Sequence, residues 1–472
     1  MPSLNLPTPP KDAPPRLRLP SGPKLESFTL ELKTITPILG GAPVPRQLPS
    51  VDAIRAPSLR GHLRFWWRAL YGHAYSDETR LDFARRERNL WGGMSLGSEE
   101  PRRSQVSLCV SGVSDASADP ASIHQSDPSF YALWPTRNGD GEDPSPRWKP
   151  GLRFTLEVRA PEGELMQEVR NAFRAWVLFG GYGSRTRRGC GSVTLVDPQE
   201  RKSWLPEDAS RAELRRLFGD LPFLQPDLAG APRDLPLLRG AWLYRGLQGE
   251  SHPLANNAWL QALGWLREFR QGTSGAPDDR PRNPAPDDDK KRAKRSNWPE
   301  ADKIRHHAKP QKMSDGPRAY PDEHAPRAQY SRSPAWPRAG FGLPIVFHFQ
   351  QKKRGTAKEF YKPAEPEGVQ LQWAMDSEKE PRDRLGSPLI VKAMPLANGR
   401  FEPIALWLER GYPKGGKVVM VQSSSLIEAT RAAFDTLRAR DDQPLFKRLR
   451  ETKPLRDVFF TWLSDTRKAR EA

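Results

Sequence analysis

Two amphipathic segments, each set between strand-like runs, constrain the fold of this chain most strongly. Residues 58–70 place leucines and two tryptophans on one stripe at helical spacing, and residues 164–179 repeat that spacing. An alternating strand pattern precedes the first segment at residues 27–37, and a closing strand is expected over residues 190–197. Because a helix with one apolar stripe must bury it against another layer, these segments predict helices packed on a sheet.

Further elements complete the first half of the chain. Ser58 is expected to cap the first helix, and a charged helix is expected over residues 78–90. Additional strands are expected over residues 105–113, 131–135 and 153–160. The resulting order resembles the split βαβ, ferredoxin-like (RRM-like) arrangement, in which an antiparallel sheet carries two helices on one face and leaves the other open for a ligand.

The second half loosely repeats this order. Ser425 and Glu428 have the spacing of a capping box, which predicts a helix from Ser425 onward, whereas residues 457–463 fit a helix or a strand equally well. The other expected elements are a strand over 240–246, a helix over 257–271, and strands over 342–350, 387–396 and 401–409. We therefore predict an α+β protein with tandem ferredoxin-like domains.

Composition sets the expected boundaries. The 49 prolines are twice the usual share of about 5%, so long Pro-rich loops are expected. Residues 1–23 are predicted to be a flexible Pro-rich leader, and residues 272–333, which contain opposed Asp and Lys/Arg runs, a mobile charged loop. The N-terminal domain is expected over 24–235, with a Gly/Arg-rich loop at 180–192, and the C-terminal domain over 236–472.

Charge and hydropathy narrow the function. Lys plus Arg is 75 and Asp plus Glu is 57, a net charge of +18, which favours a polyanionic partner, first of all nucleic acid. The mean hydropathy is −0.73 and no apolar run reaches the roughly 18 residues of a membrane span, so no membrane partner is expected. Without a signal-peptide h-region the expected location is cytoplasmic. Two cysteines, Cys109 and Cys190, make neither a disulfide framework nor a zinc site.

Two arginine-rich segments are the candidate binding residues. Arg60, Arg64 and Arg68 recur every four residues and form a ridge, with Arg55 upstream, whose guanidinium forks suit phosphates; a solvated basic face is the alternative. In the 180–192 loop, glycines are expected to turn backbone amides toward a phosphate beside arginines; a flexible, charged connection is the alternative. The residues concerned are Gly181, Gly183, Arg185, Thr186, Arg187, Arg188 and Gly189.

Other chemistries lack support in the sequence. The 180–192 loop has no Gly-Lys-Ser/Thr and joins a helix to a strand, so it is not a P-loop, and no dinucleotide fingerprint is present. The 8 histidines show no His-Glu-x-x-His spacing, and no Gly-x-Ser-x-Gly elbow occurs. His62 has a pKa range suited to a general base toward a ribose hydroxyl, although a structural histidine is the simpler interpretation. We therefore expect no catalytic residue, metal or cofactor.

Several blocks, taken in order, resemble the RAMP superfamily of CRISPR-associated proteins, and specifically the family of first RAMP subunits of type III-B (Cmr) effector complexes. They are ITPILGG (35–41), IRAPSLRGHLRFWWRALYG (54–72), LWGG (90–93), FGGYGSRTRRGCGS (179–192), RSNWPEADKIR (295–305), PRAGFGLPIVFHF (337–349) and RLGSPLIVK (384–392). The resemblance implies a non-catalytic RNA-binding subunit near the 3′ part of the guide RNA (crRNA), with target RNA and other RAMP subunits as partners.

The predicted RNA-binding set combines the basic ridge with the Gly/Arg-rich loop. Besides the residues already named, it includes Lys392 in the last of the blocks. Two alternatives stay open. One is a RAMP-type, metal-independent endoribonuclease that processes guide RNA through His62, and the other is a general basic nucleic-acid-binding protein.

Overall fold

The computed structural model describes residues 23–44, 46–49, 52–138, 143–219, 221–224, 234–247, 250–271, 282–283, 295–296, 298, 300, 304, 336–347, 368–375, 380–381, 384–411, 415–422, 425–430 and 454–472. The predicted leader lies outside these residues up to residue 22, as does most of the predicted loop 272–333.

A four-stranded antiparallel sheet organises the first half. Its strands are β1 (Leu25–Thr34), β3 (Ser107–Ser114), β6 (Arg153–Pro161) and β7 (Val193–Leu195), in the order β3-β6-β1-β7. Helix α1 (Ala56–Tyr71) lies between β1 and β3 in the chain, and α4 (Glu164–Phe179) between β6 and β7. Phe28, Leu30 and Leu32 alternate with exposed residues along β1, so one face of the sheet is buried under the helices and the other is exposed.

The second half contains a sheet of the same connectivity. Its strands are β8 (Leu237–Arg245), β13 (Leu389–Pro395), β14 (Phe401–Glu409) and β17 (Arg470–Glu471), in the order β13-β14-β8-β17. Helices α7 (Ala255–Gln271) and α11 (Leu455–Arg467) follow β8 and β14 in the chain. In both sheets the first strand of the chain lies between the third and the fourth, and the second pairs with the third. The predicted α+β class is confirmed.

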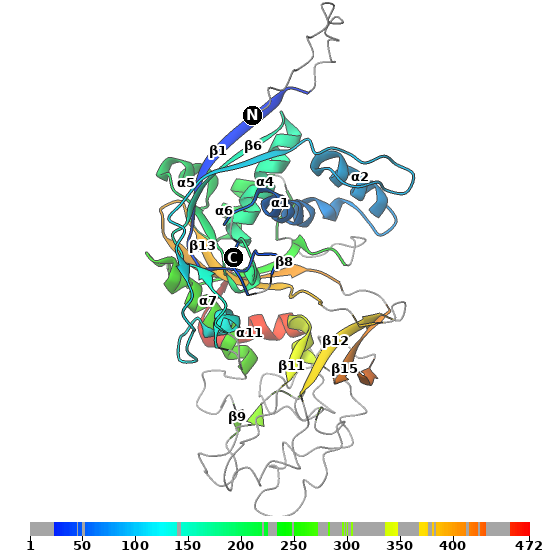
Figure 1. Ribbon diagram of the computed structural model, residues 1–472, viewed down its shortest axis with the longest axis vertical. Coiled ribbons are helices and arrows are strands. Elements are labelled where there is room, and N and C mark those ends of the chain that lie inside the picture. Colours follow the sequence, from blue (N-terminus) through cyan, green and yellow to red (C-terminus); the bar gives the residue numbers. More distant parts are fainter. Residues whose placement is uncertain are drawn as a thin grey trace, which may run out of the picture.

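The two sheets share the helices between them. Helix α4 contacts both β6 and β13, and α1 contacts both β3 and β8. Helix α7 packs on β13 and β14 from the opposite face of the second sheet. Helix α11 packs against α7. Figure 1 shows the resulting alternation, with α1 and α4 lying between the β1/β6 layer and the β8/β13 layer.

Both main cores draw residues from both halves. The first contains the α1 and α4 tryptophans and phenylalanines together with second-half residues, among them Leu238, Leu243, Ile390, Met394, Ile404 and Leu406. The second is built around α7 and α11 and takes in Ile35, Leu39, Ile123, Ala132, Leu133 and Cys190 from the first half. Because each core is completed by the other half, the expected domains 24–235 and 236–472 are joined by a continuous apolar interior.

Further strands form a sheet with its own core. The strands β11 (Ile345–Phe347), β12 (Val369–Met375), β15 (Gly416–Gln422) and β16 (Ser425–Thr430) pair in that order around a third cluster that includes Trp336 and Trp373. Helix α2 (Arg80–Trp91) follows α1 in the chain. The remaining elements are short: β2 (Ile38–Leu39), β4 (Ala118–Asp119), β5 (Arg147–Trp148), β9 (Arg282–Asn283), β10 (Arg295–Ser296), α3 (Phe130–Leu133), α5 (Pro198–Trp204), α6 (Arg211–Phe218), and the 3₁₀ turns η1 (Gly72–Ala74), η2 (Trp134–Thr136), η3 (Thr186–Arg188) and η5 (Pro337–Phe341).

Three local predictions are wrong. Helix α1 begins at Ala56 with Arg55 at the N-cap and no side-chain cap, so Ser58 lies inside its first turn. Residues 131–135 lie in α3 and η2 rather than in a strand, since α3 packs on α7 and buries Ala132 and Leu133. Residues from Ser425 form β16, because pairing with β15 outweighs the local capping-box spacing. The undecided residues 457–463 are helical, within α11.

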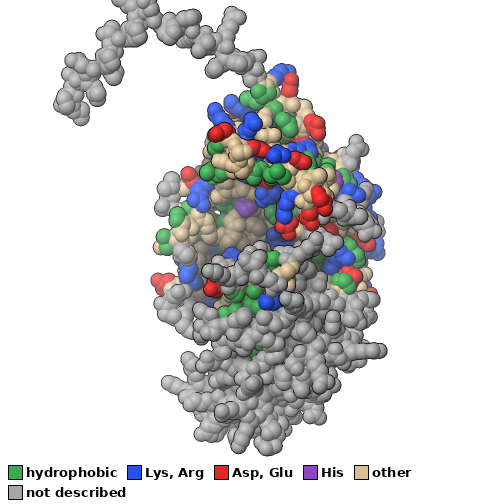
Figure 2. Space-filling model, turned by 90° about the vertical axis from the view of Figure 1, so that its right-hand side faces the viewer, with side chains coloured by type: hydrophobic (Ala, Val, Ile, Leu, Met, Phe, Trp, Pro, Cys, Tyr) green, Lys and Arg blue, Asp and Glu red, His purple; other side chains and the backbone are tan. Residues whose placement is uncertain are grey.

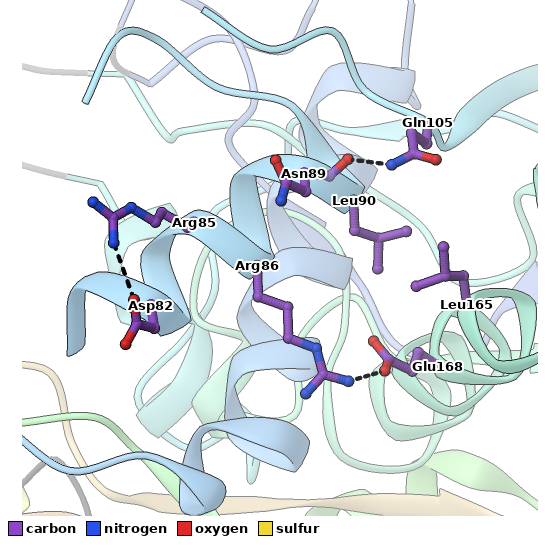
Figure 3. Close-up of a pocket in the computed structure, with 8 residues that line it drawn as sticks. All are labelled: Asp82, Arg85, Arg86, Asn89, Leu90, Gln105, Leu165 and Glu168. Atoms are coloured by element: carbon purple, nitrogen blue, oxygen red, sulfur yellow. Dashed lines mark hydrogen bonds and ion pairs between the residues drawn. The ribbon is translucent and has the colours of Figure 1, made fainter. Parts of the chain in front are cut away.

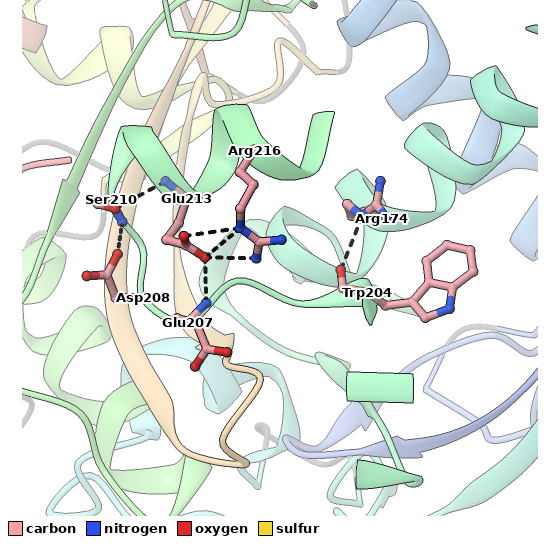
Figure 4. A network of polar contacts seen from close by, with 7 residues as sticks. All are labelled: Arg174, Trp204, Glu207, Asp208, Ser210, Glu213 and Arg216. Atoms are coloured by element: carbon pink, nitrogen blue, oxygen red, sulfur yellow. Dashed lines mark hydrogen bonds and ion pairs between the residues drawn. The ribbon is translucent and has the colours of Figure 1, made fainter. Parts of the chain in front are cut away.

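A polar network fixes the connection from the first half to the second (Figure 4). Ser210 caps α6 by accepting a hydrogen bond from the Glu213 amide, and Glu213 in turn pairs with Arg216 at 2.9 Å and accepts the Glu207 amide. Next to this cap the Ala209 amide donates to the Glu402 carboxyl of β14 at 2.8 Å. Burial raises the pKa of Glu402 to about 7. The cap therefore also anchors this segment to the second sheet.

Among the described residues, no helix has the length and apolar character that crossing a membrane requires.

The shared core predicts that the two halves unfold together. Met394→Ala in β13 removes a fully buried side chain from the first core, which both halves form. The substitution should lower the free energy of unfolding by about 2–5 kcal/mol. Hydrogen exchange measured by mass spectrometry should show lost protection in α4 as well as in β13. Met420→Ala is the matched control, since Met420 is equally buried in the separate third cluster. Unchanged α4 protection in Met394→Ala would mean that the halves are independent.

Candidate nucleic-acid interface

The loop 180–192 lies against the second half, and its glycines permit close backbone contact. A Cβ on Gly191, whose φ is +65°, would lie 1.8 Å from the Tyr182 carbonyl oxygen. A Cβ on Gly183 would lie 2.7 Å from the Leu39 carbonyl, and one on Gly189 would meet the Trp259 ring of α7 at 2.6 Å. The space at these positions is therefore taken up by the protein itself.

Several amides of this loop are already bonded within the fold. The Ser184 amide donates to the Leu39 carbonyl at 2.8 Å, the Gly189 amide to Thr186 at 2.9 Å, and the Gly191 amide to Pro37 at 2.8 Å. The sequence-based idea of a glycine loop that turns its amides to a phosphate does not hold for Gly189, because its N–H is used internally. Gly181 also packs its backbone closely, with a Cβ position 2.8 Å from the Cys190 carbonyl.

Lys392 does not face a ligand, which corrects its place in the predicted RNA-binding set. It is 0% exposed in β13, and its Nζ donates to the carbonyls of Val177 at 2.9 Å and Gly180 at 2.8 Å. These carbonyls end α4, where the last turn of a helix leaves acceptors without partners. Burial lowers the pKa of Lys392 to about 7. The residue is therefore a cap that joins the second sheet to a first-half helix.

The arginine ridge on α1 is held by internal partners. Arg64 Nε and Arg68 Nη1 both donate to the Glu87 Oε1 of α2, at 2.7 and 2.9 Å. Arg60 donates to the Val106 carbonyl at 2.9 Å and to the Ser104 hydroxyl. Upstream, Arg55 Nη2 donates to the Gly41 carbonyl at 2.6 Å. The ridge thus holds α2 and the approach to β3 against α1, and it is not the solvated face that was the alternative.

The loop arginines differ from those of the ridge, because other arginines lie close to them and lower their pKa values. Burial lowers the pKa of Arg187 to about 10, and Arg410 adds repulsion. Burial likewise lowers the pKa of Arg188 to about 10 and that of Arg185, with further lowering from Arg270 beside both. The charge of Arg384 also lowers the pKa of Arg185. We call Arg185, Arg187, Arg188, Arg270 and Arg384 the arginine cluster.

Hydrogen bonds and ring contacts position the arginine cluster. Arg187 donates through Nη1 to the Ser387 carbonyl and lies over the Phe65 ring of α1, 5.9 Å from its centroid. The Arg188 carbonyl accepts the Trp259 indole N–H at 2.7 Å, which fixes the loop on α7. Within the described part of the chain, no carboxylate lies within 4.0 Å of the cluster's guanidinium groups. Among the described residues, five positive charges therefore gather without a carboxylate partner, and such a concentration of positive charge attracts an anion.

Sequence reasoning missed Arg270 and Arg384 as members of this group. Arg270 lies in the last turn of α7 and Arg384 precedes β13, so neither is near the loop in the chain. Only the docking of η3 on β13 and of Arg188 on α7 brings them together. Arg384 stands in the RLGSPLIVK block before the apolar run 388–396, whereas Lys392 lies inside that run and is buried.

The open face of the first sheet is a weaker candidate. Its arginines are paired, Arg153 with Glu31 at 3.1 Å and Arg159 with Glu157 at 2.6 Å. The outward positions of β1, β3 and β6 carry no aromatic side chain on which a base could stack. Figure 2 shows acidic and basic side chains interspersed on the side of the molecule that carries α2, so charge is mixed there too.

A cleft of about 370 Å³ lies between α2, α4 and the approach to β3 (Figure 3). Its arginines are neutralised: Arg85 pairs with Asp82 at 3.0 Å, and Arg86 pairs with the buried Glu168, which also accepts the Trp67 indole N–H at 2.7 Å. Figure 3 shows the Arg86 side chain directed at Glu168 across the cleft. An anion would have to displace a buried carboxylate here, so the cleft does not suit a phosphate.

His62 lies on α1 with its ring 5.8 Å from that of Tyr182. Burial lowers its pKa, which favours the neutral imidazole. In the described part of the chain no group of three or more His, Cys, Asp or Glu side chains has an arrangement that would hold a metal ion.

Comparison with known proteins gives a family match over the first half. Residues 31–194 match the RAMP superfamily. The chain is 27% identical over 177 residues to the CRISPR system Cmr subunit Cmr1-1 of Pyrococcus furiosus. These 177 residues cover 36% of this chain and 48% of that protein. The chain thus matches about half the length of this curated relative.

Solved structures were also compared. The apo crystal structure of Cmr1 from Pyrococcus furiosus superposes with a TM-score of 0.43 at 15% identity, covering 94% of this chain and 98% of that chain. A chain of the type III-B Cmr-beta bound to cognate target RNA and AMPPnP, in the presence of ssDNA, gives a TM-score of 0.38 at 11% identity over 80% and 94% of the two chains.

The loop glycines predict a sharp contrast between two Gly→Ala variants. Gly191 and Gly219 both have a φ of +65°, but a Cβ on Gly219 meets nothing within 4 Å. Gly219→Ala should cost about 1–3 kcal/mol of backbone strain, because a φ of +65° with a ψ of −139° is a conformation that residues with a Cβ rarely adopt. Gly191→Ala must also move the Tyr182 carbonyl and should cost about 3 kcal/mol or more. Urea unfolding of both variants measures this contrast, and equal costs would contradict the close backbone contact.

Buried Lys392 predicts a specific pH dependence. The folded pKa of about 7 lies below the ordinary value of 10.5, so between these values the unfolded chain binds more protons and stability rises with pH. Lys392→Met removes this dependence, so the stability advantage of the wild type over the variant should grow above pH 7, by at most about 1.4 kcal/mol per pH unit. Urea unfolding from pH 6 to 9 measures it, with the pH 6 difference as the baseline for the lost hydrogen bonds. A constant difference would contradict the buried cation.

Proposed function

We propose that this chain, whose residues 31–194 match the RAMP superfamily, is an RNA-binding subunit of a type III-B CRISPR effector complex. The relative that it matches over part of its length is named as a Cmr subunit, which supports such an assembly as its setting. Its partners are then guide RNA, target RNA and other RAMP subunits. The two sheets of identical connectivity support tandem ferredoxin-like domains, and two free cysteines fit a cytoplasmic location.

The arginine cluster is the observation that carries this proposal. Arg185, Arg187 and Arg188 have lowered pKa values because burial and neighbouring cations disfavour their charge. A phosphate backbone alongside them supplies opposite charge, and guanidinium groups bind phosphate oxygens through paired N–H donors. Binding of RNA would therefore relieve an electrostatic cost that the folded protein carries.

The structure suggests an order of importance among the predicted binding residues. The cluster arginines contact phosphates most directly, with Gly181, Gly183, Thr186 and Gly189 shaping the loop. Arg55, Arg60, Arg64 and Arg68 contribute through the donors that their internal partners leave over; the Arg64 and Arg68 side chains remain 31% and 34% exposed. Within the complex we assign these contacts to the 3′ part of the guide RNA or to the guide–target duplex, with no catalytic step in this subunit.

The salt dependence of RNA binding tests this proposal. With about six phosphate contacts, the slope of log K against log salt should be near −4, and replacing Arg185, Arg187 and Arg188 by Ala should reduce it by about two units. The control replaces Arg153, Arg159 and Arg216, which removes the same charge from arginines paired with Glu31, Glu157 and Glu213. The control slope should stay near that of the wild type. A change that is equal in both variants would leave only a general charge effect.

Gels run from the same samples test the non-catalytic role. In EDTA, native gels should show shifted RNA and denaturing gels intact RNA. Specific cleavage that His62→Ala abolishes would instead establish the endoribonuclease alternative. Equal affinity for duplex DNA, together with no association with RAMP subunits, would favour a general nucleic-acid-binding protein.

A further inference from the structure

Trp134 is the exposed tryptophan of this protein. The structure describes all 15 tryptophans, and 14 of them are buried or partly buried, whereas Trp134 is 44% exposed. Leaving so large an apolar ring in water forgoes the free energy that its burial would contribute. An exposed aromatic side chain of this size is therefore a candidate contact for a ligand.

A rigid turn holds Trp134 in place. On one side in the chain, Ala132 and Leu133 are buried in the core beside α7. On the other, Thr136 is fully buried, and its hydroxyl donates to the Leu133 carbonyl at 2.9 Å and accepts from Arg147 at 3.2 Å. The backbone of η2 is thus anchored on both sides while the indole remains outside. Because this backbone is already ordered, the segment loses little conformational entropy when the ring binds a ligand.

The indole also lies beside the arginine cluster. The Arg185 guanidinium carbon is 5.1 Å from the Trp134 ring centroid, and that of the exposed Arg137 is 4.8 Å from it. Arg137 also donates to the Trp134 carbonyl at 3.3 Å. Aromatic rings next to a basic track are the usual means by which proteins hold single-stranded nucleic acid, since phosphates pair with the cations while bases stack on the rings.

We propose that Trp134 is a stacking platform for one base of single-stranded RNA whose backbone follows the arginine cluster, an inference that rests on the proposed function. The base lies against the indole, and Arg185 contacts a phosphate next to that base. Because every base has a π face, this contact adds affinity with little dependence on sequence. It supplies a base contact that the open face of the first sheet lacks.

The experiment compares a uridine-rich RNA with an abasic strand of the same length and charge. Trp134→Ala should weaken binding of the RNA by about tenfold, as stacking contacts do, and leave binding of the abasic strand unchanged. Its salt slope should match that of the wild type, because no phosphate contact is lost. Trp134→Phe should keep most of the affinity. Leu254→Ala, which removes another exposed apolar side chain, is the control and should bind both strands normally.

Each outcome separates this inference from the proposed function. If the wild type binds RNA with the expected salt slope but Trp134→Ala binds both strands as the wild type does, the stacking platform is wrong and the RNA-binding role stands. An equal loss for both strands also overturns it, since no base is then read. If the wild type binds no single-stranded RNA, both fail. Should Trp134→Ala not fold, crosslinking of the wild type to 4-thiouridine RNA decides, and adducts confined to peptides far from Trp134 contradict the proposal.

Discussion

The docking of the Gly/Arg-rich loop and the end of α4 onto the second half is the constraint on which the rest of the structure depends. Lys392 of β13 caps the final carbonyls of α4, and the Trp259 indole of α7 holds the Arg188 carbonyl. A glycine is needed where the loop meets the second half, as at Gly189, where a Cβ would lie 2.6 Å from the Trp259 ring and 2.9 Å from the Val391 carbonyl oxygen. These contacts place α4 between two sheets of identical connectivity, so that each half completes the core of the other.

The same docking creates the arginine cluster. Arg187 and Arg188 are carried into a partly buried position beside cations from α7 and from the segment before β13, where burial and repulsion disfavour their charge. The apolar interior shared by the halves offsets this cost, because each large buried side chain contributes about 1.5–3 kcal/mol. Binding sites commonly retain such locally unfavourable arrangements, which the remaining fold stabilises.

Sequence patterns predicted the elements that depend on local periodicity. Helix α4 spans the predicted residues 164–179, and the alternation of β1 correctly gave its buried face. The errors occur where tertiary contacts decide. Residues 131–135 form helical turns because α3 packs on α7, and the residues from Ser425 form a strand because they pair with β15. Lys392 was included as a basic residue of the last block, although it stands in the continuous apolar run 388–396, a pattern typical of a strand that is buried on both faces.

The candidate site shows why arginine spacing alone does not identify an anion site. Arg64 and Arg68 have the regular spacing of a binding ridge, yet one carboxylate from α2, Glu87, accepts from both. The cluster arginines have no regular spacing and meet no carboxylate among the described residues. Since a ligand that binds only the folded state stabilises it, a polyanion at the cluster strengthens the contact between loop and second half. Under the proposed function RNA is that polyanion, so its binding and the cohesion of the two halves would be coupled through the same side chains.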